Sequence, residues 1–240
     1  MKATNMKRRD ALKMLTALGI SAAAPRQSYG QSLAPESPGD RIVFDNEKVR
    51  VVRHSATPGQ DVYVATPQRF PRLALFLTDA TVRSAAAGKK VGYSKGALVW
   101  LEGAAGSAEN AGAVESVVYL VEPKGNPPAS PGDREQAQRN KEAPPPNVSG
   151  KVLLDNAWVR VIEHLARPRM GVCGMGMHTH PPHLTIGITD GRVKIVEPGK
   201  EPAIREVKAG RVFWDEGGPH AIQNLSSRDT RAILIEFKGA

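Results

Sequence analysis

Short stretches of alternating apolar and polar residues recur along most of the chain. Residues 159–162 and 192–196 alternate in this way, which is typical of β-strands that bury one face. Turn-forming pairs such as Asp190-Gly191 separate the stretches, because glycine and proline favour turns over continued strands. No long segment beyond the N-terminal region has helical periodicity. The pattern therefore predicts an all-β fold, a sandwich or barrel of short strands.

The strand pattern occurs twice, in segments whose matches keep the same order. Asn110 and Asn224 occupy corresponding positions near the ends of the two segments. The other matching stretches are 44–52 with 154–162, 75–83 with 186–194, 96–103 with 210–217, and 117–120 with 232–235. A repeat of this extent indicates two copies of one domain, here residues 41–121 and 151–240.

A proline-rich stretch, residues 122–150, lies between the two copies. Proline at this density cannot enter a helix or the interior of a sheet, so the stretch is predicted to be a linker. Two arrangements follow from it. The copies are either separate barrels joined by this linker, or they pack sheet against sheet, and the sequence leaves both open.

Three of the six histidines mark a candidate metal site in the second copy. His178 and His180 are two residues apart, so an extended chain presents both imidazoles on one face. Glycines precede this pair and leave room on that face. His220 follows a Gly-Pro turn at the start of a later strand. Two imidazoles from one strand and a third from a turn suit a divalent metal.

These residues resemble the two motifs of the cupin superfamily. Its first motif is a glycine, an H-x-H pair, usually a glutamate, and a closing glycine. Its second motif is a glycine, a tight turn ending in a histidine, and an asparagine four residues later. His178, His180 and Gly191 fit the first motif, and His220 and Asn224 fit the second. The resemblance implies a bicupin, two jelly-roll-like double-stranded β-barrels in tandem, with a metal held by the three histidines.

One departure from the family pattern concerns the glutamate. Leu184 stands where the glutamate should be, next to His183. Either the site has three protein ligands, or a local distortion at Pro181-Pro182 lets His183 serve as a fourth. Adjacent strand residues face opposite ways, which favours three ligands, but both alternatives stay open. The predicted cofactor is one divalent transition metal, Fe, Zn, Ni, Cu or Mn, because imidazole ligands alone do not choose among them.

The first copy lacks the corresponding histidines. Residues 65–72, at the place of the first motif, contain none, and Gly106 stands at the position of His220. Glu102 and Gly103 keep the turn. This copy is therefore expected to keep the fold without binding metal, and to serve in packing, in partner binding or as a lid.

The remaining candidate residues are expected to be structural. His54 and His164 follow the first strand of each copy and have no metal partner in view. Cys173 is the single cysteine, which excludes an intrachain disulfide and a cysteine-rich zinc site. With no evident base beside it, its thiol is expected to be a small buried apolar group rather than a nucleophile.

The N-terminal 30 residues are predicted to be an export signal. Arg8 and Arg9 precede an apolar run, residues 14–24, which ends in small residues, as secretory signals do. The paired arginines resemble a twin-arginine signal, although Ala11 stands where an aromatic residue is usual. The alternative is an ordinary amphipathic cytosolic helix. Residues 31–40 read as a flexible lead-in, and the protein is expected to be periplasmic or secreted without a membrane anchor.

The net charge of +9 would suit a nucleic-acid partner, but its distribution does not. Residues 1–30 hold six Lys and Arg against one Asp, a net charge of +5, which leaves +4 for the remaining 210 residues. No basic stripe with interleaved aromatic residues is present in the sequence, as nucleic-acid binding would need. No nucleic-acid partner is expected.

The candidate site fits two kinds of chemistry. Three protein ligands leave coordination positions for water or a substrate. A redox metal would suit a cupin dioxygenase, and a non-redox metal would act as a Lewis acid, as in cupin isomerases and lyases. No catalytic base can be assigned. The alternative is a non-catalytic metal- or ligand-binding module, a sensor or a storage protein. The small-molecule partner and any homo-oligomer are left open.

Overall fold

The structure is a computed structural model that describes residues 40–63, 71–85, 87–101, 107–125 and 150–238. The predicted export signal and nearly all of the lead-in and linker lie outside the described residues, as do Gly106 and most of the first-motif stretch of the first copy. The described residues form strands and no helix, which confirms the all-β prediction. No helix long and apolar enough to cross a bilayer occurs in these ranges.

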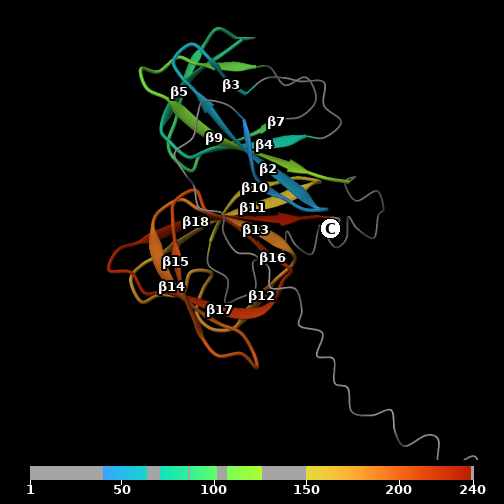
Figure 1. The fold of residues 1–240 in the computed structure, drawn as a ribbon, viewed down its shortest axis with the longest axis vertical. Helices are drawn as coiled ribbons and strands as arrows, with labels where there is room; N and C mark the ends of the chain where they lie inside the picture. Colours follow the sequence, from blue (N-terminus) through green and yellow to red (C-terminus); the bar gives the residue numbers. More distant parts are fainter. Residues whose placement is uncertain (1–39, 64–70, 86, 102–106, 126–149, 239–240) are drawn as a thin grey trace, which may run out of the picture.

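The described residues of the first copy form nine strands in two antiparallel sheets (Figure 1), with strand orders β1-β2-β9-β4-β7 and β3-β8-β5-β6. The strands are β1 (Arg41–Asp45), β2 (Val49–Ala56), β3 (Asp61–Tyr63), β4 (Arg72–Phe76), β5 (Ala80–Ser84), β6 (Lys90–Tyr93), β7 (Leu98–Leu101), β8 (Ala108–Asn110) and β9 (Ser116–Pro123). Strand β9 ends two residues beyond Val121, inside the stretch predicted to be linker.

The second copy repeats this arrangement strand for strand, with orders β10-β11-β18-β13-β16 and β12-β17-β14-β15. Its strands are β10 (Lys151–Asp155), β11 (Val159–Ala166), β12 (His178–His180), β13 (His183–Gly187), β14 (Gly191–Val196), β15 (Ala203–Val207), β16 (Val212–Asp215), β17 (Gly218–Asn224) and β18 (Thr230–Phe237). Each copy thus has a five-stranded and a four-stranded sheet, the two halves of a double-stranded β-barrel.

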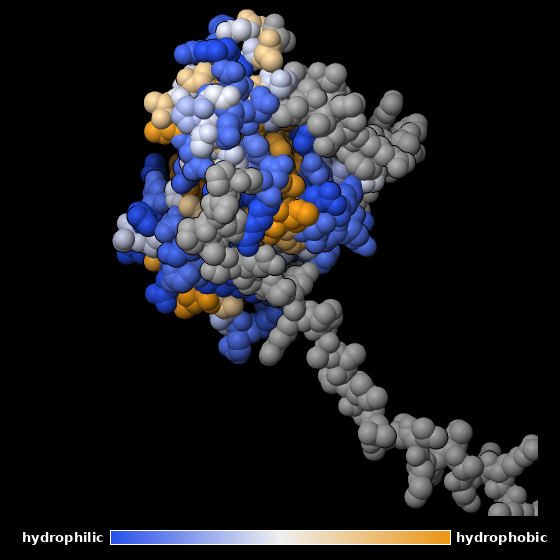
Figure 2. All heavy atoms as spheres, turned by 45° about the horizontal axis from the view of Figure 1, so that its top comes forward, coloured by the Kyte–Doolittle hydropathy of each residue, from blue (hydrophilic) through white to orange (hydrophobic). Residues whose placement is uncertain are grey.

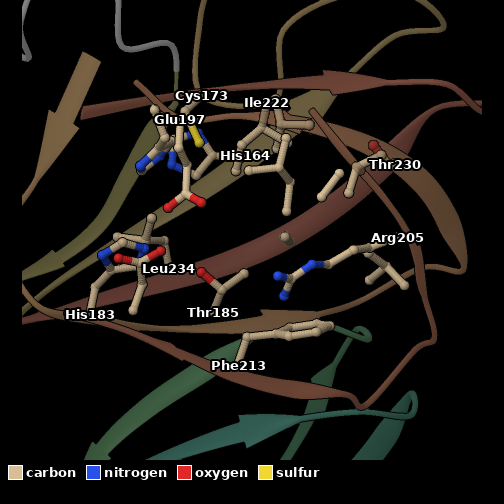
Figure 3. A pocket seen from close by; sticks show the side chains of 18 of the residues that line it. His164, Cys173, His183, Thr185, Glu197, Arg205, Phe213, Ile222, Thr230 and Leu234 are labelled. Atoms are coloured by element: carbon tan, nitrogen blue, oxygen red, sulfur yellow. The ribbon is translucent and has the colours of Figure 1, made fainter. Parts of the chain in front are cut away.

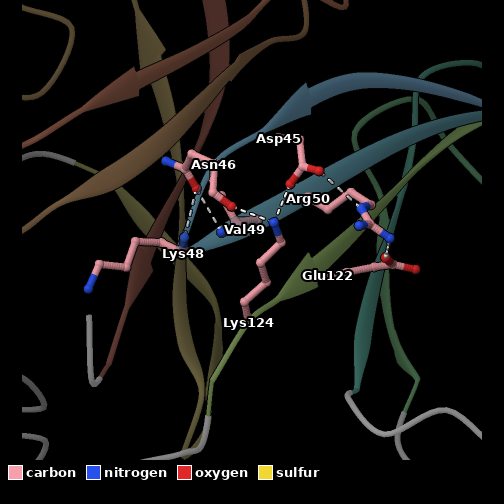
Figure 4. A network of polar contacts seen from close by, with 7 residues as sticks. All are labelled: Asp45, Asn46, Lys48, Val49, Arg50, Glu122 and Lys124. Atoms are coloured by element: carbon pink, nitrogen blue, oxygen red, sulfur yellow. Dashed lines mark hydrogen bonds and ion pairs between the residues drawn. The ribbon is translucent and has the colours of Figure 1, made fainter.

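The first hairpin of each copy is closed by the same asparagine turn. The Asn46 side-chain oxygen accepts hydrogen bonds from backbone N–H groups two and three residues ahead, at 2.9 and 2.8 Å (Figure 4). Asn156 does the same at 2.9 Å for both bonds. Such Asx turns satisfy the backbone locally and reverse the chain. A β-bulge precedes the turn, at the same place on the first strand of both hairpins.

In each copy, the lysine that directly follows the last strand forms a hydrogen bond with the aspartate just before this turn. The Lys124 ammonium donates to the Asp45 carboxylate (Figure 4), and this bond holds the pKa of Asp45 below its usual value. Lys238 donates to the carboxylate of Asp155 in the same way. The repeat seen in the sequence is therefore a repeat of polar contacts as well as of strands.

The repeated asparagines are structural. Asn110 donates its side-chain amide to two backbone carbonyls, at 2.8 and 2.7 Å, and Asn224 does so at 2.9 Å for both bonds. Both are buried. A buried amide that satisfies otherwise unpaired carbonyls stabilises a loop that no apolar residue could hold. This explains why the asparagine persists in the copy that lacks the histidines.

The five-stranded sheets of the two copies pack face to face, so the sheet-against-sheet alternative is the one observed. The apolar side chains between them form one cluster, here named the inter-copy core. Its buried members are Val49, Val51, Leu73, Leu75, Tyr119, Val121, Val159, Val161, Leu184, Ile186, Ile188, Trp214, Ile233, Ile235 and Phe237. Strand β18 is covered on both faces, which explains its continuous apolar run from Ala232 to Ile235.

Hydrogen bonds between described residues join the copies at this interface. The Tyr119 hydroxyl donates to the Gly210 carbonyl at 2.5 Å, and a guanidinium nitrogen of Arg231 donates to the Lys95 carbonyl at 2.6 Å. Burial raises the pKa of Tyr119 to about 12, so the phenol stays a donor at any physiological pH. Both bonds end on loop carbonyls, which fixes how one copy sits on the other.

The outer surface is mainly hydrophilic. Figure 2 shows a largely polar face on which hydrophobic residues form small, separate patches. The most exposed large apolar side chains, Val114, Met175 and Leu165, lie in different parts of the sequence. Scattered apolar residues of this kind are ordinary on protein surfaces. The large apolar areas are therefore the inter-copy core and the interiors of the two barrels.

Candidate metal centre and barrel cavity

The predicted histidines meet across a pair of antiparallel strands in the second copy. Strand β12 pairs with β17, and the pairing places His178 directly opposite His220. The ring centroids of these two lie 4.7 Å apart, and those of His180 and His220 lie 5.6 Å apart. All three side chains are buried. The i,i+2 spacing on β12 and the turn before His220 thus bring three imidazoles together.

A fourth candidate ligand, Cys173, comes from the loop before β12. The Val172 N–H donates to the Ile222 carbonyl at 2.8 Å, which holds this loop against β17. A Cβ at Gly171 would lie 1.6 Å from the Gly174 carbonyl oxygen, so the loop can close only with glycine there. The side-chain nitrogen and sulfur atoms that lie within 4.8 Å of one another belong to Cys173, His178, His180 and His220.

This group, named the His₃Cys cluster, leaves its metal-binding nitrogens unused. The Nε2 atoms of His178, His180 and His220 are buried and have no hydrogen-bond partner among the described residues. Burying a polar nitrogen without a hydrogen-bond partner lowers the stability of the folded protein, so such atoms need an explanation. A single ion bound by all three would satisfy them, so the residues present fit a metal.

The other ring nitrogens are positioned as they would be in a metal site. The Nδ1 of His178 lies 3.1 Å from the Gly176 carbonyl, and that of His180 lies 2.9 Å from the Glu236 carboxylate. A proton on Nδ1 donates to these oxygens and leaves the lone pair on Nε2. Metal-ligating histidines are commonly oriented by such partners.

The spacing of the cluster matches the bond lengths of transition metals. Metal bonds to imidazole nitrogen and thiolate sulfur are roughly 2.0–2.3 Å long, so two ligand atoms of one site lie at most about 4.6 Å apart. The four atoms of the His₃Cys cluster lie within 4.8 Å of one another. Small rotations of the side chains are enough to close it on an ion.

Burial sets the protonation of these groups in the metal-free chain. Desolvation, helped by the charge of His178, lowers the pKa of His220 to about 4, and desolvation also lowers the pKa of His178. Both imidazoles are therefore neutral at pH 7, as ligation requires. Burial raises the pKa of Cys173 to about 12. Its thiol is protonated until a cation stabilises the thiolate, so metal binding there releases a proton.

His183, whose role the sequence left open, lies beside the cluster and not within it. It begins β13, and its Nδ1 lies 2.8 Å from the Pro181 carbonyl. Its ring centroid is 5.2 Å from that of His180. The fourth place in the group of mutually close ligand atoms is taken by Cys173. His183 instead lines a cavity next to the cluster.

That cavity has a volume of about 450 Å³ and lies inside the second barrel, between its two sheets. In Figure 3, Cys173 and His183 lie toward one side, with the guanidinium of Arg205 reaching into the space from the other. Thr185 lies between them, and Phe213 forms part of the floor in this view. The cluster is therefore open to a chamber of the size that binds small organic molecules.

Two further residues near the cluster are positioned differently from what the sequence suggested. His164 was expected to be a structural residue without a metal partner; its ring centroid lies 6.1 Å from that of His180, and it lines the cavity. Glu236 was not singled out at all. A buried carboxylate within the apolar strand β18 was the signal that could have found it.

The sequence matches no protein-family model and no curated protein, but its structure resembles solved ones. A cupin 2 conserved barrel domain protein from Leptotrichia buccalis aligns with a TM-score of 0.52 at 15% identity, over 87% of this chain and 92% of that chain. The chain has the cupin fold. At this identity the similarity establishes the fold of the chain and no shared activity.

Other similar solved structures also align over most of the chain. Oxalate decarboxylase from Bacillus subtilis, described with Mn(II) centres, aligns with a TM-score of 0.51 at 12% identity, over 80% of this chain and 69% of that chain. Pumpkin seed globulin aligns with a TM-score of 0.51 at 11% identity, over 78% of this chain and 76% of that chain. The alignments extend over both copies, consistent with a tandem arrangement.

Replacing Glu236 by Gln is expected to weaken metal binding by the protein about 10- to 100-fold, the usual effect of losing a carboxylate that orients a metal-ligating histidine. The amide keeps the size of the side chain but removes its charge from His180 Nδ1. Competition with a chromogenic chelator would measure the affinity. Glu206→Gln, at an exposed position, is the matched control, and equal affinities in the two variants would contradict the assigned role.

Proposed function

We propose that this cupin binds one divalent transition metal through His178, His180, His220 and Cys173, and presents it to a small molecule held in the barrel cavity. The observation that carries the proposal is the set of three buried Nε2 atoms without hydrogen-bond partners among the described residues, next to a thiol and a chamber of about 450 Å³. No packing role accounts for three such nitrogens at one place.

The ligand chemistry narrows the choice of metal. Thiolate favours zinc, copper and iron, imidazole suits zinc, copper, iron and nickel, and manganese prefers carboxylate and water. The His₃Cys cluster contains no carboxylate ligand. Of the metals compatible with the histidines alone, manganese is therefore the least suited to this site. A bound ion would supply either redox chemistry with dioxygen or Lewis-acid polarisation of a bound oxygen.

The protein residues around the site would have three tasks in an enzyme. Glu236 and the Gly176 carbonyl orient two of the imidazoles, and the apolar cavity wall excludes water from a bound molecule. His183 is the candidate for proton transfer. Burial lowers its pKa, its Nδ1 faces the Pro181 carbonyl, and the neutral ring therefore keeps an acceptor lone pair on Nε2.

A second function, metal binding without catalysis, is favoured by Cys173. Four protein ligands complete a tetrahedral site, as in structural zinc sites, whereas catalytic sites keep a position open. If the thiolate and three imidazoles fill the coordination shell, the cavity ligand cannot reach the metal. The protein would then be a metal- or ligand-binding module.

Substituting cobalt(II) for the native metal tests both the cluster and the choice between the functions. We expect a thiolate-to-cobalt charge-transfer band in the wild-type protein and its absence in Cys173→Ser. Loss of a direct ligand should also weaken binding by more than the roughly 100-fold upper effect of an orienting partner. The same band in Cys173→Ser would show that the thiol is no ligand.

Addition of azide to the cobalt protein separates the two functions. A change in the visible ligand-field bands means that the metal accepts an outside ligand, as the enzyme proposal requires. Unchanged bands at saturating azide mean a closed site and favour the binding module. The cobalt-free protein with azide is the control for binding elsewhere.

We also propose that residues 1–30 direct export and are removed. The order of charged, apolar and small residues in the sequence supports this. In the source cell, Arg8→Lys with Arg9→Lys is expected to leave most of the protein in the cytoplasm, because a twin-arginine signal depends on the pair. Lys7→Arg with Lys13→Arg keeps the same charge and serves as control. Full-length wild-type protein confined to the cytoplasm would refute the proposal.

A further inference from the structure

Methionine is confined to one exposed loop in the part of the chain that forms the two barrels. Beyond residue 14, the sequence contains methionine only at Met170, Met175 and Met177. None of the three belongs to the inter-copy core or to the apolar cluster inside the first barrel, although methionine ordinarily fills gaps in cores. Their side chains are 47%, 64% and 43% exposed, respectively. Packing in these cores therefore does not explain why methionine stands here.

The same loop contains Cys173 and places its sulfur in the opposite environment. Both ends of the loop are held on β17, by the hydrogen bond from Val172 to Ile222 and by the pairing of β12 with β17. Cys173 is 3% exposed and lines the cavity inside the barrel. Met175, two residues later, is the most exposed of the three methionines. One short loop thus separates a buried thiol from thioethers in solvent.

This separation reverses the usual order in which the two kinds of sulfur are oxidised. In an unfolded chain, a thiol reacts with oxidants more readily than a thioether, because its thiolate is the stronger nucleophile. In a folded chain, susceptibility also follows exposure. The loop withdraws the thiol from solvent and leaves the thioethers there. A dissolved oxidant therefore meets the methionines first.

We propose that Met170, Met175 and Met177 form a site of reversible oxidation, which consumes hydrogen peroxide or hypochlorous acid before these oxidise Cys173. Each thioether sulfur gives up two electrons and gains one oxygen atom, which yields methionine sulfoxide. The O–O bond of hydrogen peroxide breaks and its second oxygen leaves as water, whereas hypochlorous acid leaves chloride and a proton. The sparing of Cys173 as a ligand rests on the proposed metal centre, and the modification itself does not.

The exposed position also determines what the modification does to the fold. A sulfoxide is polar and disrupts an apolar core, but on this loop water hydrates the added oxygen. Met177 directly precedes the buried His178 and is itself exposed, because adjacent residues of an extended chain face opposite ways. Its sulfoxide therefore lies away from the His₃Cys cluster. We expect the oxidised chain to keep its strands and its metal.

Treatment of the metal-free full chain with hydrogen peroxide tests the order of oxidation. Trypsin cleavage after Arg169 and Arg192 leaves the three methionines and the cysteine on one peptide, residues 170–192, in which fragment masses locate each added oxygen. When half of Met175 is oxidised, Cys173 is expected to be oxidised at least about tenfold less. The same treatment in guanidinium chloride is the control and should oxidise Cys173 first. Equal oxidation of both residues in the folded chain, or methionines that stay unmodified, would overturn the proposal.

Leucine variants test whether the methionines spare the thiol. The triple variant Met170→Leu, Met175→Leu and Met177→Leu removes the thioethers and keeps apolar side chains of similar volume. At one equivalent of hypochlorous acid per zinc-loaded chain, this variant is expected to lose severalfold more Cys173 thiol than the wild type, and more zinc with it. Ile204→Leu, at a position on β15 that is 56% exposed, is the matched control and should behave as the wild type. Equal thiol loss in the triple variant and the wild type would overturn the sparing of Cys173.

Enzymatic reduction tests reversibility. Methionine sulfoxide reductases of two kinds act on the two sulfoxide epimers, and together they are expected to return the oxidised folded chain to its original mass. Sulfoxides that persist after this treatment would overturn reversibility. A wild-type chain that retains no zinc refutes the proposed metal centre, whereas the order of oxidation is decided separately on the metal-free chain.

Discussion

Alanine at both His178 and His180 is expected to abolish metal retention while the strands remain. The substitution removes two of the four groups in the His₃Cys cluster. Both lie on β12, a three-residue strand at the edge of its sheet, so few other contacts depend on them. The first copy keeps the same strand order with no histidine at the corresponding places.

The loss of metal should also lower thermal stability. An ion present at about 1,000 times its dissociation constant stabilises the folded state by roughly 4 kcal/mol, and the variant forfeits this contribution. Elemental analysis, circular dichroism and thermal unfolding would measure the three effects. His54→Ala, which removes a histidine of the first copy bound to the Asp61 carbonyl, is the control and should retain metal. Unchanged metal content in the double variant would refute the site.

A fragment that begins near Ser149 is expected to bind metal but to self-associate. The His₃Cys cluster, Glu236 and the cavity all belong to the second copy. In Figure 1, strands β12, β14 and β17 lie on the side of the second barrel away from the first copy. Removing the first copy therefore leaves every candidate ligand in place.

The same truncation uncovers the second-copy half of the inter-copy core. Val159, Val161, Leu184, Ile186 and Ile235 are all at most 1% exposed in the full chain. Burial of each such side chain stabilises the folded state by about 1.5–3 kcal/mol. Exposing all five would therefore lose a burial free energy comparable to the roughly 5–15 kcal/mol by which a whole domain is stable. Dimerisation through this face would restore the burial.

Light scattering after gel filtration and mass spectrometry under non-denaturing conditions would test this prediction. We expect concentration-dependent dimers or larger species with one metal per fragment. The full-length chain under the same conditions is the control and should also carry one metal. A freely soluble monomeric fragment would contradict the importance of the inter-copy core. Two metals per full-length chain would show that the first copy binds metal after all.

Features that depend on local sequence were predictable. The alternation of side chains identified strands such as β11 and β14, and the repeated asparagines identified corresponding positions in the two copies. The pair His178 and His180 could be assigned to one face because their spacing decides it in any extended chain. His220 could be added from its turn and from the resemblance to a known motif.

Features that depend on distant parts of the chain were not predictable. Cys173 enters the cluster because its loop folds back on β17. The glycines around Cys173 allow this fold of the loop, but the local sequence does not predict it. Glu236 reaches His180 from 56 positions away in the sequence. The inward orientation of Arg205 depends on which face of β15 closes the barrel, and a strand with Ile204 beside Arg205 does not reveal that face by itself.

The inter-copy core also has a consequence for synthesis on the ribosome. Strand β9 ends at Pro123, whereas β18, which supplies Ile233 and Ile235 to the interface, ends at Phe237, 114 residues later. At about 5–20 residues per second, translation needs roughly 6–23 s to cover that distance. If the first copy folds as soon as it is synthesised, its half of the inter-copy core stays exposed to solvent during this time. The exposed apolar face favours binding of a chaperone during this interval, which ends when β18 has left the ribosome and packs against the first copy.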